Sequence, residues 1–338
     1  MSKGKVTSFD IAYRAGVSQS TVSRAMSGSP LVSQDTREHI LAIAREMNYT
    51  VDKSASNLRR QHSATLAVLI FEDPTIDDSL INPFFTTLLG AILKSAGQAN
   101  YDVLVSFQQF NTDWHAAYLD SNKADGLLLL GYGDYVASQG VLERLAESGT
   151  KFVRWGNLQG SGVSIGSDNR QGGYTATRHL LQRGARRIAF IGDCSEHSPE
   201  FRERYLGHCD ALAEFGIEPD PALQVGVADS MEVMGERATQ QLLESGARFD
   251  GLFAASDLLA IGSIYALHSA GRSVPDDVAV VGFDDMPVAR YHNPPLTTVH
   301  QDTKRAGQVM VEAILALIKG EAVESQQIAS ELVVRSSA

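Results

Sequence analysis

The sequence predicts an α/β protein with a small all-α helix-turn-helix head and a larger, two-lobed, doubly wound parallel-sheet domain. Three observations support this prediction. Residues 1–62 contain three short helical patterns, strands alternate with helices from residue 63 onward, and charge is divided unevenly between the two parts. A chain of 338 residues is long enough for two or three domains.

The charge is positive in the head and negative in the rest of the chain. Residues 1–62 carry nine Lys or Arg against five Asp or Glu, a net charge of +4. The whole chain has a net charge of −11, so the remainder carries −15. A basic head on an acidic body is typical of a nucleic-acid-binding module joined to a part that avoids phosphate.

Several classes of function lack their usual sequence patterns. We find no apolar run of the length of a signal peptide or membrane span, and we therefore expect a cytoplasmic protein. Cys194 and Cys209 are too few for a disulfide framework or a zinc cluster, and the nine histidines lack metal-ligand spacing. Nucleophile-elbow, phosphate-loop and zinc-protease motifs are also absent, so we expect no enzyme, cofactor or metal site.

The head begins with three capped helical segments. Thr7 and Asp10 have the spacing of a capping box, while Ser18 and Ser33 are good N-cap residues for the second and third helices. Gly16 can adopt the positive φ that a tight turn between the first two helices requires. The predicted helices span residues 7–15, 19–26 and 34–49. Two short helices joined by a glycine turn and braced by a third form a helix-turn-helix.

The second helix carries side chains suited to reading a DNA major groove. Residues at the N-terminal end of such a helix reach base edges, and here Gln19 can pair with adenine and Arg24 with guanine. Small hydroxyl side chains beside them are suited to phosphate contacts. The predicted DNA-binding residues of the head are Thr7, Ser18, Gln19, Ser20, Thr21, Ser23 and Arg24. The alternative is a small polar helix start without this role.

The segment from Ala12 to Arg24 reads A-x-x-A-G-V-S-x-x-T-V-S-R. This pattern resembles the head of the lactose/galactose repressor family nearly residue for residue, and a looser resemblance continues to about residue 335. The resemblance implies a transcriptional regulator with a helix-turn-helix domain at residues 1–49, a hinge helix at 50–62 and an effector-binding, dimerising domain at 63–338.

The hinge at residues 50–62 is polar and of marginal length for an isolated helix. The resemblance implies that it orders on DNA, with Leu58 wedged into the minor groove and Ala55 beside it. A disordered linker is the alternative. Family members usually have Pro-Asn where this chain has Val51-Asp52, and Val51 lacks the fixed φ of proline.

From residue 63 onward, short apolar runs alternate with helical patterns, as in an open parallel sheet covered by helices on both faces. The length of this region indicates two such lobes. The predicted strands are residues 64–71, 101–107, 125–131, 151–155, 186–192, 249–255 and 277–283, with a last strand in 328–338. Helices are expected at 85–99, 172–184, 234–245 and 257–271, and residues 193–207 read as a loop.

Ligands of such sheets bind beyond the carboxyl ends of the strands, where this sequence places aromatic, acidic, Arg and Gln side chains. Carboxylates accept from hydroxyl groups and aromatic rings stack on the apolar face of a sugar. The alternatives are that Phe84 or Phe85 is core and that Asp257 is only a helix cap; Trp155 stacks or packs. Asp284 and Asp285 together beside Arg204 would be costly without a purpose.

The resemblance also implies a body of the periplasmic-binding-protein type, with two lobes, three crossovers and a ligand between the lobes. Lobe one is then expected at about 63–163 and 294–325, and lobe two at about 164–293 and 326–338. Motifs such as Asn82–Phe85, Ser167–Asn169, Arg204–Gly207 and Gly282–Asp285 match the family. By position, the expected effector-binding residues are Phe84, Phe85, Asp168, Arg204, Ser256, Asp257, Asp284 and Gln301.

These features predict a repressor of carbohydrate-utilisation genes that binds a pseudo-palindromic operator as a homodimer. Its effector would be a sugar or sugar phosphate, and the family mostly releases DNA on binding it. The alternatives are a purine or nucleoside effector, a sugar-binding receptor without a DNA role, and a cytosolic enzyme. No leucine heptad follows residue 328, so we expect a dimer. Because no apolar run is long enough to span a membrane, we expect no membrane partner.

Overall fold

The computed structural model describes residues 6–49, 62–71, 81–108, 118–119, 121–131 and 134–338. The chain divides into two compact units, Met1–Ser63 and Ala64–Ala338. The predicted hinge residues Ala55 and Leu58, with Val51 and Asp52, lie outside the described residues.

The first unit is a three-helix head, as predicted. The helices are α1 (Ser8–Ala15), α2 (Gln19–Met26) and α3 (Gln34–Glu46), packed on a core of apolar residues that includes Ile11, Val22 and Ile40. The Thr7–Asp10 capping box is present, and Gly16 ends α1 with φ 67°. Ser18 and Ser33 cap α2 and α3. Local hydrogen bonds thus fix each helix start.

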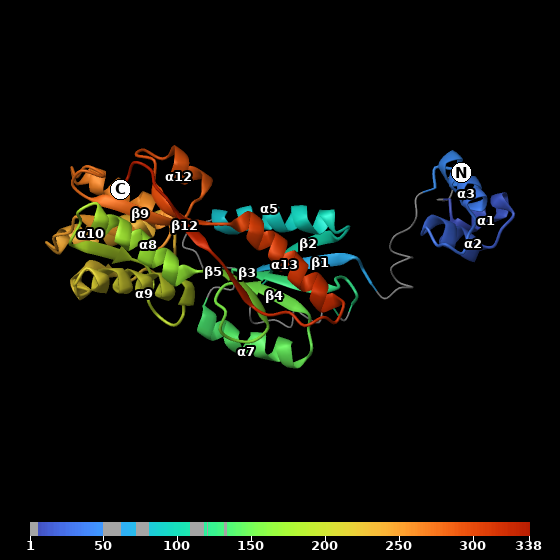
Figure 1. The fold of residues 1–338 in the computed structure, drawn as a ribbon, viewed down its shortest axis with the longest axis horizontal. Helices are drawn as coiled ribbons and strands as arrows, with labels where there is room; N and C mark the ends of the chain where they lie inside the picture. Colours follow the sequence, from blue (N-terminus) through green and yellow to red (C-terminus); the bar gives the residue numbers. More distant parts are fainter. Residues whose placement is uncertain (1–5, 50–61, 72–80, 109–117, 120, 132–133) are drawn as a thin grey trace. The chain divides into compact units, whose positions relative to one another are not determined.

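The second unit contains two six-stranded sheets. Lobe one is the first sheet with its helices, in the strand order β11-β5-β4-β3-β1-β2, all parallel. Its strands are β1 (Thr65–Phe71), β2 (Asp102–Gln108), β3 (Gly126–Leu130), β4 (Phe152–Trp155), β5 (Val163–Ser167) and β11 (Gln326–Ile328). Figure 1 shows α5 (Pro83–Gln98) and α13 (Thr303–Ile318) side by side on one face of this sheet and α7 (Tyr135–Glu147) on the other.

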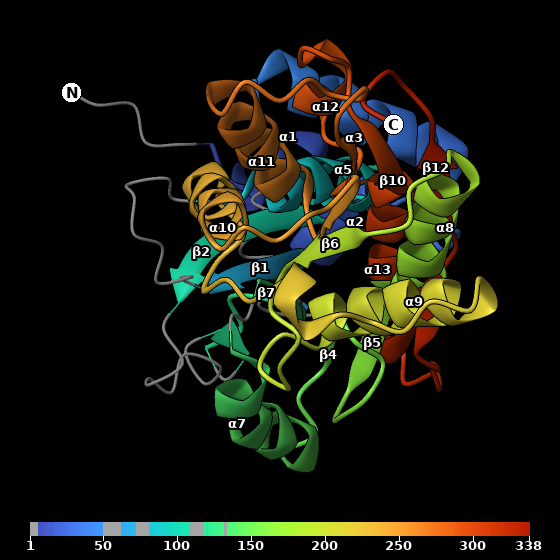
Figure 2. The same ribbon diagram turned by 90° about the vertical axis from the view of Figure 1, so that its left-hand side faces the viewer.

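Lobe two is the second sheet with its helices, in the order β12-β10-β9-β8-β6-β7, with β12 antiparallel to β10. Its strands are β6 (Ile188–Ile191), β7 (Gln224–Val225), β8 (Gly251–Ala254), β9 (Ala279–Asp284), β10 (Thr297–Gln301) and β12 (Ser330–Val333). Figure 2 shows α8 (Asn169–Gln182) and α9 (Pro199–Glu214) on one side of this sheet, and α10 (Glu232–Glu244) and α11 (Asp257–Ser269) on the other. Two short helices, η1 (Pro221–Leu223) and α12 (Pro287–Tyr291), complete the lobe.

Glycines bring the paired helices of lobe two close together. A Cβ on Gly173 of α8 would lie 2.0 Å from the carbonyl oxygen of Arg204 on α9, and one on Gly207 would lie 2.0 Å from that of Arg170. Only a residue without a side chain fits at these points, so the α8–α9 contact sets the position of Arg204.

The chain crosses between the lobes three times, at places that differ from those expected. We expected crossovers near residues 163, 293 and 325. Instead, β5 pairs with β4 through Ile165 and extends to Ser167, β10 pairs with β9 through His300 and extends to Gln301, and β11 pairs with β5 through Ile328. The expected boundaries are too early because residues 163–167 and 297–301 continue a sheet before the chain leaves it. Among the described residues, no helix is both long and apolar enough to cross a membrane.

Candidate functional site

In the head, the start of α2 is ordered by hydroxyl groups. Ser18 Oγ accepts from the backbone N–H of Thr21 at 3.2 Å. The same oxygen lies 2.8 Å from both Ser20 Oγ and Thr21 Oγ1. These hydrogen bonds hold the first turn of α2. They also keep the three hydroxyl groups close together, where a phosphate can contact them.

Apart from Thr7, which caps α1, the remaining head residues of the predicted set lie on α2. Ser20, Ser23 and Arg24 are exposed, while Gln19 is half-buried and its Nε2 donates to Ser8 Oγ at 3.2 Å. Thr7 differs from them because its hydroxyl, its N–H and the Asp10 carboxylate are already paired in the capping box. The structure therefore gathers six of the seven residues on α2 and its cap.

Two aromatic side chains of the head lie outside the predicted set. Phe9 is 68% exposed and Tyr13 is 92% exposed, both on α1. Helical spacing could have indicated their exposure, because neither residue lies on the apolar stripe that contains the buried Ile11 and Ala12.

In lobe two, Arg204 is a buried cation on α9, although residues 193–207 were expected to form a loop. Only 4% of Arg204 is exposed. Its guanidinium carbon lies 3.7 Å from the ring centroid of Phe283 and 5.0 Å from that of Phe201. Its Nε donates to Asn169 Oδ1 at 2.8 Å, and its Nη1 donates to the carbonyl oxygen of Ala255. Burial lowers the pKa of Arg204, but a guanidinium remains charged at neutral pH.

Asp284 and Gln301, at the ends of β9 and β10, face this cation. Asp284 Oδ1 lies 3.6 Å from Arg204 Nη1 and accepts from Gln301 Nε2 at 2.6 Å. Burial raises the pKa of Asp284 to about 6, although Arg204 and Gln301 favour the charged form. The three side chains form a buried polar cluster with one cation and one titratable carboxyl group.

Asp257 lies next to this cluster but is fully buried. Its Oδ1 accepts from Thr298 Oγ1 at 2.5 Å and its Oδ2 from the N–H of Met286 at 2.7 Å. Burial, followed by the charge of Asp284, raises the pKa of Asp257 well above its ordinary value. The helix-cap alternative is wrong for this residue, since Ser256 is the N-cap of α11 and accepts from Leu259 N at 3.3 Å. Asp257 joins three elements, and each of its carboxylate oxygens accepts a hydrogen bond from within the protein.

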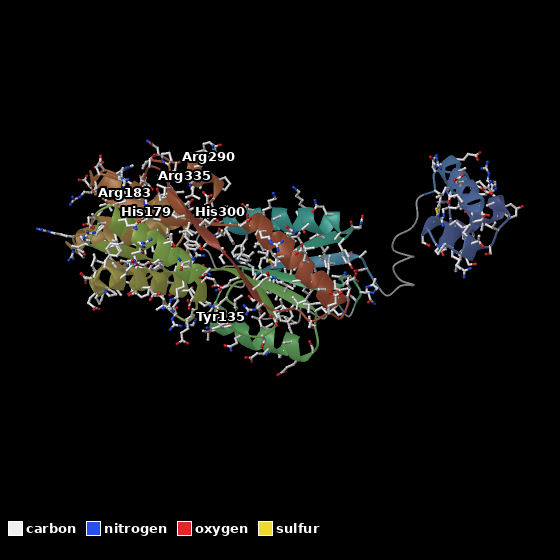
Figure 3. All side chains as sticks on the ribbon, viewed as in Figure 1. Tyr135, His179, Arg183, Arg290, His300 and Arg335 are labelled. Atoms are coloured by element: carbon white, nitrogen blue, oxygen red, sulfur yellow. The ribbon has the colours of Figure 1, made fainter. Side chains whose placement is uncertain are left out.

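The two consecutive acidic residues point to different partners. We expected both beside Arg204, but Asp285 instead accepts from Arg335 Nη2 at 2.5 Å and lies 3.1 Å from His300 Nδ1. Figure 3 labels Arg335 and His300 on lobe two. The chain leaves the extended conformation here, with a φ of 120° at Asp284 and 52° at Asp285, and only Asp284 reaches the buried cluster.

The aromatic residues form a separate group on lobe one. Phe84 packs edge-on against Phe85, with ring centroids 5.4 Å apart, and lies 5.8 Å from Trp155. Phe84 and Trp155 are buried, and Phe85 is half-buried. Their apolar cluster also includes Met231, Leu258 and Met286, which come from lobe two. The cluster therefore spans the contact between the lobes.

Asp168 caps α8, and its Oδ1 accepts from Gln171 N at 3.1 Å. Its neighbour Asn169 is the residue that contacts Arg204. The sequence predicts Asp168 of the Ser-Asp-Asn motif as an effector-binding residue, and the structure adds Asn169 as the member of the motif that contacts Arg204. The direction of a side chain in the first turn of a helix depends on where the preceding strand ends.

Polar contacts also join the lobes. Asp134 Oδ2, at the start of α7, lies 2.8 Å from His197 Nδ1, and the N–H of Tyr135, labelled in Figure 3, donates to the carbonyl oxygen of His197 at 3.0 Å. Asn157 N donates to Glu200 Oε1 at 2.7 Å. The hydrogen bond to Asp134 raises the pKa of His197.

A further polar contact between the lobes lies beside the aromatic group. Asn82 Nδ2 donates to Ser230 Oγ at 3.0 Å, and Ser256 Oγ donates to the carbonyl oxygen of Ser230 at 3.4 Å. Within the described part of the chain, no group of His, Cys, Asp and Glu could hold a metal ion.

Comparisons with known proteins agree with this architecture. A model of bacterial regulatory proteins of the lacI family matches residues 9–52, and one of a periplasmic binding protein-like domain matches residues 177–338. The HTH-type transcriptional regulator CelR of Thermobifida fusca is 32% identical over 337 residues, covering 97% of this chain and 96% of that protein.

Solved structures resemble both units together. A transcriptional regulator CelR-cellobiose complex has a TM-score of 0.73 at 30% identity, covering 99% of this chain and 100% of the other. The lac repressor dimer bound to operator and the anti-inducer ONPF has a TM-score of 0.82 at 27% identity, covering 98% and 99%.

A helix-turn-helix head followed by a periplasmic binding protein-like body defines a class of transcriptional regulator. The chain belongs to the lacI family of bacterial regulatory proteins. It is a DNA-binding regulator and not an enzyme, which confirms the family expected from residues 12–24.

Proposed function

We propose that this regulator is a cytoplasmic repressor whose affinity for operator DNA is controlled by a sugar or sugar phosphate. The observation that carries the effector proposal is the buried Arg204–Asp284–Gln301 cluster at the carboxyl ends of the lobe two strands. A charged donor and a carboxylate that lie 3.6 Å apart in a buried site can each hydrogen-bond to vicinal hydroxyl groups of a ligand. A relative that binds cellobiose supports the same class of ligand.

In this proposal, Arg204, Asp284 and Gln301 bind the polar side of the ligand, with Asn169 orienting the Arg204 guanidinium. Phe84 and Phe85 provide the apolar side from lobe one. Asp168, Ser256 and Asp257 belong to the site as supports, since each fixes a helix start or a loop that carries a contact residue.

A purine or nucleoside is the second candidate effector. The observation that favours it is the aromatic group of Phe84, Phe85 and Trp155, because a planar base can stack between such rings. The two candidates differ in chemistry, so a binding screen separates them directly.

We propose that α2 enters the major groove of the operator, with Gln19, Ser20 and Arg24 at base edges. Ser18, Thr21 and Ser23 would then contact phosphates, with Thr7 at the edge of this contact. Residues 50–62 would serve as the hinge, with Ala55 and Leu58 in the minor groove, between a head at 1–49 and a body at 63–338.

The operator would be pseudo-palindromic because the protein would bind it as a homodimer. The edge strand β2 and helix α5 of lobe one support this proposal. Leu104, Val105 and Phe107 on β2 and Leu93 on α5 are all at least 40% exposed, which is unusual for large apolar side chains on neighbouring elements. A second copy would cover them.

We propose that the effector releases the operator by changing the angle between the lobes. The Asp134–His197, Asn157–Glu200 and Asn82–Ser230 contacts hold one lobe arrangement without a ligand. A ligand shifts DNA affinity only by its difference in affinity for the two arrangements.

The test begins with selection of an operator by the full chain from a pool of random duplexes at physiological salt. Thermal shift with cellobiose, ribose, glucose 6-phosphate, hypoxanthine and adenosine then identifies the effector class, and gel shift with the selected duplex measures release. We expect a palindromic sequence and a carbohydrate response. Recovery of no preferred sequence would contradict the operator proposal, and a response to hypoxanthine or adenosine alone would replace the carbohydrate proposal.

A further inference from the structure

The turn that presents Asp284 has an unusual backbone. Asp284 has a φ of 120° and Asp285 a φ of 52°, both in the region that side-chain-bearing residues rarely adopt. Two such residues in succession persist only where the surrounding structure over-determines them. Asp284 also provides the carboxyl group of the buried cluster, so the contacts that hold this turn determine where that group lies.

On one side, the turn is held by Asp257 and Thr298. The N–H of Met286 donates to Asp257 Oδ2 at 2.7 Å, and the N–H of Asp285 donates to Thr298 Oγ1 at 3.4 Å. Thr298 Oγ1 in turn donates to Asp257 Oδ1 at 2.5 Å. These bonds fix the backbone after Asp284 but leave the Asp285 carboxylate to other partners.

On the other side, the turn is held by Arg335, which follows β12 and is 50 residues further along the chain. Arg335 Nη2 donates to Asp285 Oδ1 at 2.5 Å, and both side chains are mostly buried. Arg335 Nη1 donates to the carbonyl oxygen of Leu296 at 2.8 Å, and its backbone N–H to Thr297 Oγ1 at 2.9 Å. Arg335 therefore binds the start of β10 and the Asp285 carboxylate of the turn at the same time.

We propose that Arg335 is a positioning residue of the effector site: its ion pair with Asp285 holds the strained turn and thereby keeps the Asp284 carboxylate against Arg204 and Gln301. Arg335 touches neither the cluster nor the proposed ligand. The inference uses the proposed function only in assigning Asp284 to an effector site; the geometry of the turn stands without it.

An arginine is suited to this role because its planar fork can donate to the Asp285 carboxylate and the Leu296 carbonyl at the same time. Lysine has one ammonium group and meets one of these partners well. His300 Nδ1 also lies against Asp285, at 3.1 Å, and its imidazole is 41% exposed, so it contributes a weaker and solvent-screened contact.

The test compares the full-length wild type with Arg335→Gln, Asp285→Asn and the double variant at constant pH. Amide hydrogen exchange is followed at residues 283–286. We expect each single change to speed exchange of the Asp285 and Met286 amides by roughly tenfold, with no further increase in the double variant because both changes break one pair. Arg335→Lys should give an intermediate rate.

The matched control is Arg187→Gln, which removes an exposed ion pair with Asp220 and a bond to the Arg248 carbonyl in the same lobe. It should leave exchange at residues 283–286 unchanged. A carboxyl titration of Asp284, observed by carbon NMR with aspartate labelling and assigned with Asp284→Asn, gives a second readout. Its midpoint should move from near 6 toward the ordinary 3.8 in Arg335→Gln, because a released turn exposes the carboxyl group to water.

Unchanged exchange and an unchanged titration in both single variants would overturn the proposal. So would faster exchange across all of lobe two, since that result would make Arg335 a general stabilising residue. If Arg335→Gln does not fold, Asp285→Asn decides, because it breaks the same pair and leaves the Leu296 bond. If exchange speeds up only at the turn and no sugar shifts the melting temperature of the wild type, this inference holds and only the proposed effector is contradicted.

Discussion

The guanidinium carbon of Arg204 lies over the ring of Phe283, 3.7 Å from its centroid, while Nη1 of Arg204 lies 3.6 Å from Oδ1 of Asp284, the residue after Phe283. One strand end thus provides both an aromatic face and a counter-charge to the same cation. Arg204 is held by packing as well as by charge, and both contacts offset the cost of burying its cation.

Replacing Arg204 with alanine should be strongly destabilising. The change leaves the buried Asp284 without its cation, and loss of one partner of a buried pair costs about 3–5 kcal/mol. Urea unfolding measures the difference. The control is Arg170→Ala, whose pair with Asp210 is exposed (side chains 53% and 43%), and it should cost at most about 1 kcal/mol. An equal loss of unfolding free energy in the two variants would show that the buried Arg204–Asp284 pair contributes no more to stability than an exposed pair.

The raised pKa of Asp284 predicts a particular pH dependence of stability. The unfolded chain releases this proton near pH 3.8, but the folded protein retains it until about pH 6. The contribution of Asp284 to the free energy of unfolding should therefore fall as pH rises through this window and level off above it. Asp284→Asn should remove that fall in urea titrations between pH 4 and 7.

An exposed aspartate provides a control of opposite sign. Hydrogen bonds from Ser273 lower the pKa of Asp277, so its contribution is present above the ordinary pKa and lost as pH falls below it. Asp277→Asn should make the stability of the protein decrease less on acidification. If Asp284→Asn and Asp277→Asn shift the curve in the same direction, the assignment of Asp284 is incorrect.

Gly173→Ala should disturb the effector cluster from a distance. Its Cβ would lie 2.0 Å from the carbonyl oxygen of Arg204, so α8 and α9 must separate. We expect lower thermal stability and faster amide exchange around Arg204. Gly90→Ala on α5 is the control, since nothing lies within 4 Å of its added Cβ, and it should stabilise the helix by about 0.5–1 kcal/mol. A neutral Gly173→Ala would refute the close-contact explanation.

The Asp134–His197 contact predicts a pH-sensitive link between the lobes. The pKa of His197 is raised by Asp134, so the stabilisation is fully present below the ordinary pKa of 6.5 and is lost as pH rises through the folded value. His197→Gln should reduce the difference in melting temperature between pH 6 and pH 8.5. His268→Gln, a change at an exposed histidine of α11, should not. The same pH response in both variants would argue against the link.

Arg24→Ala should weaken binding to the selected operator by roughly tenfold or more, because an arginine at a base edge contributes about 1–3 kcal/mol. Arg45→Ala removes the same charge from the exposed last turn of α3 and should have a much smaller effect. Gel shifts at fixed salt measure both. A greater loss for Arg45→Ala would place the DNA-binding surface elsewhere on the head.

The head was predictable because its determinants are local. A cap and its partner lie three residues apart, and the hydrogen bonds of Thr7, Ser18 and Ser33 all follow from that spacing. The seven strands predicted before residue 284 are also present. Six of them are buried, as continuous apolar runs indicate for parallel strands, whereas β2 is a largely exposed edge strand.

The remainder depended on long-range contacts that spacing does not encode. The strand Val163–Ser167 was missed because glycine and serine interrupt its apolar pattern. Asp257 resembles a helix start in sequence, but its partners Met286 and Thr298 lie on other elements. Likewise, no local pattern indicates that Asp285 pairs with Arg335 rather than with Arg204.

The strands β11 and β12 occupy residues 326–333 and complete one edge of each sheet. During synthesis these residues leave the ribosome after every other strand. Until then, β5 and β10 remain open edges that can pair with another nascent chain. Neither lobe can therefore finish folding ahead of the other, and a polypeptide shortened before residue 326 would carry two unprotected edges.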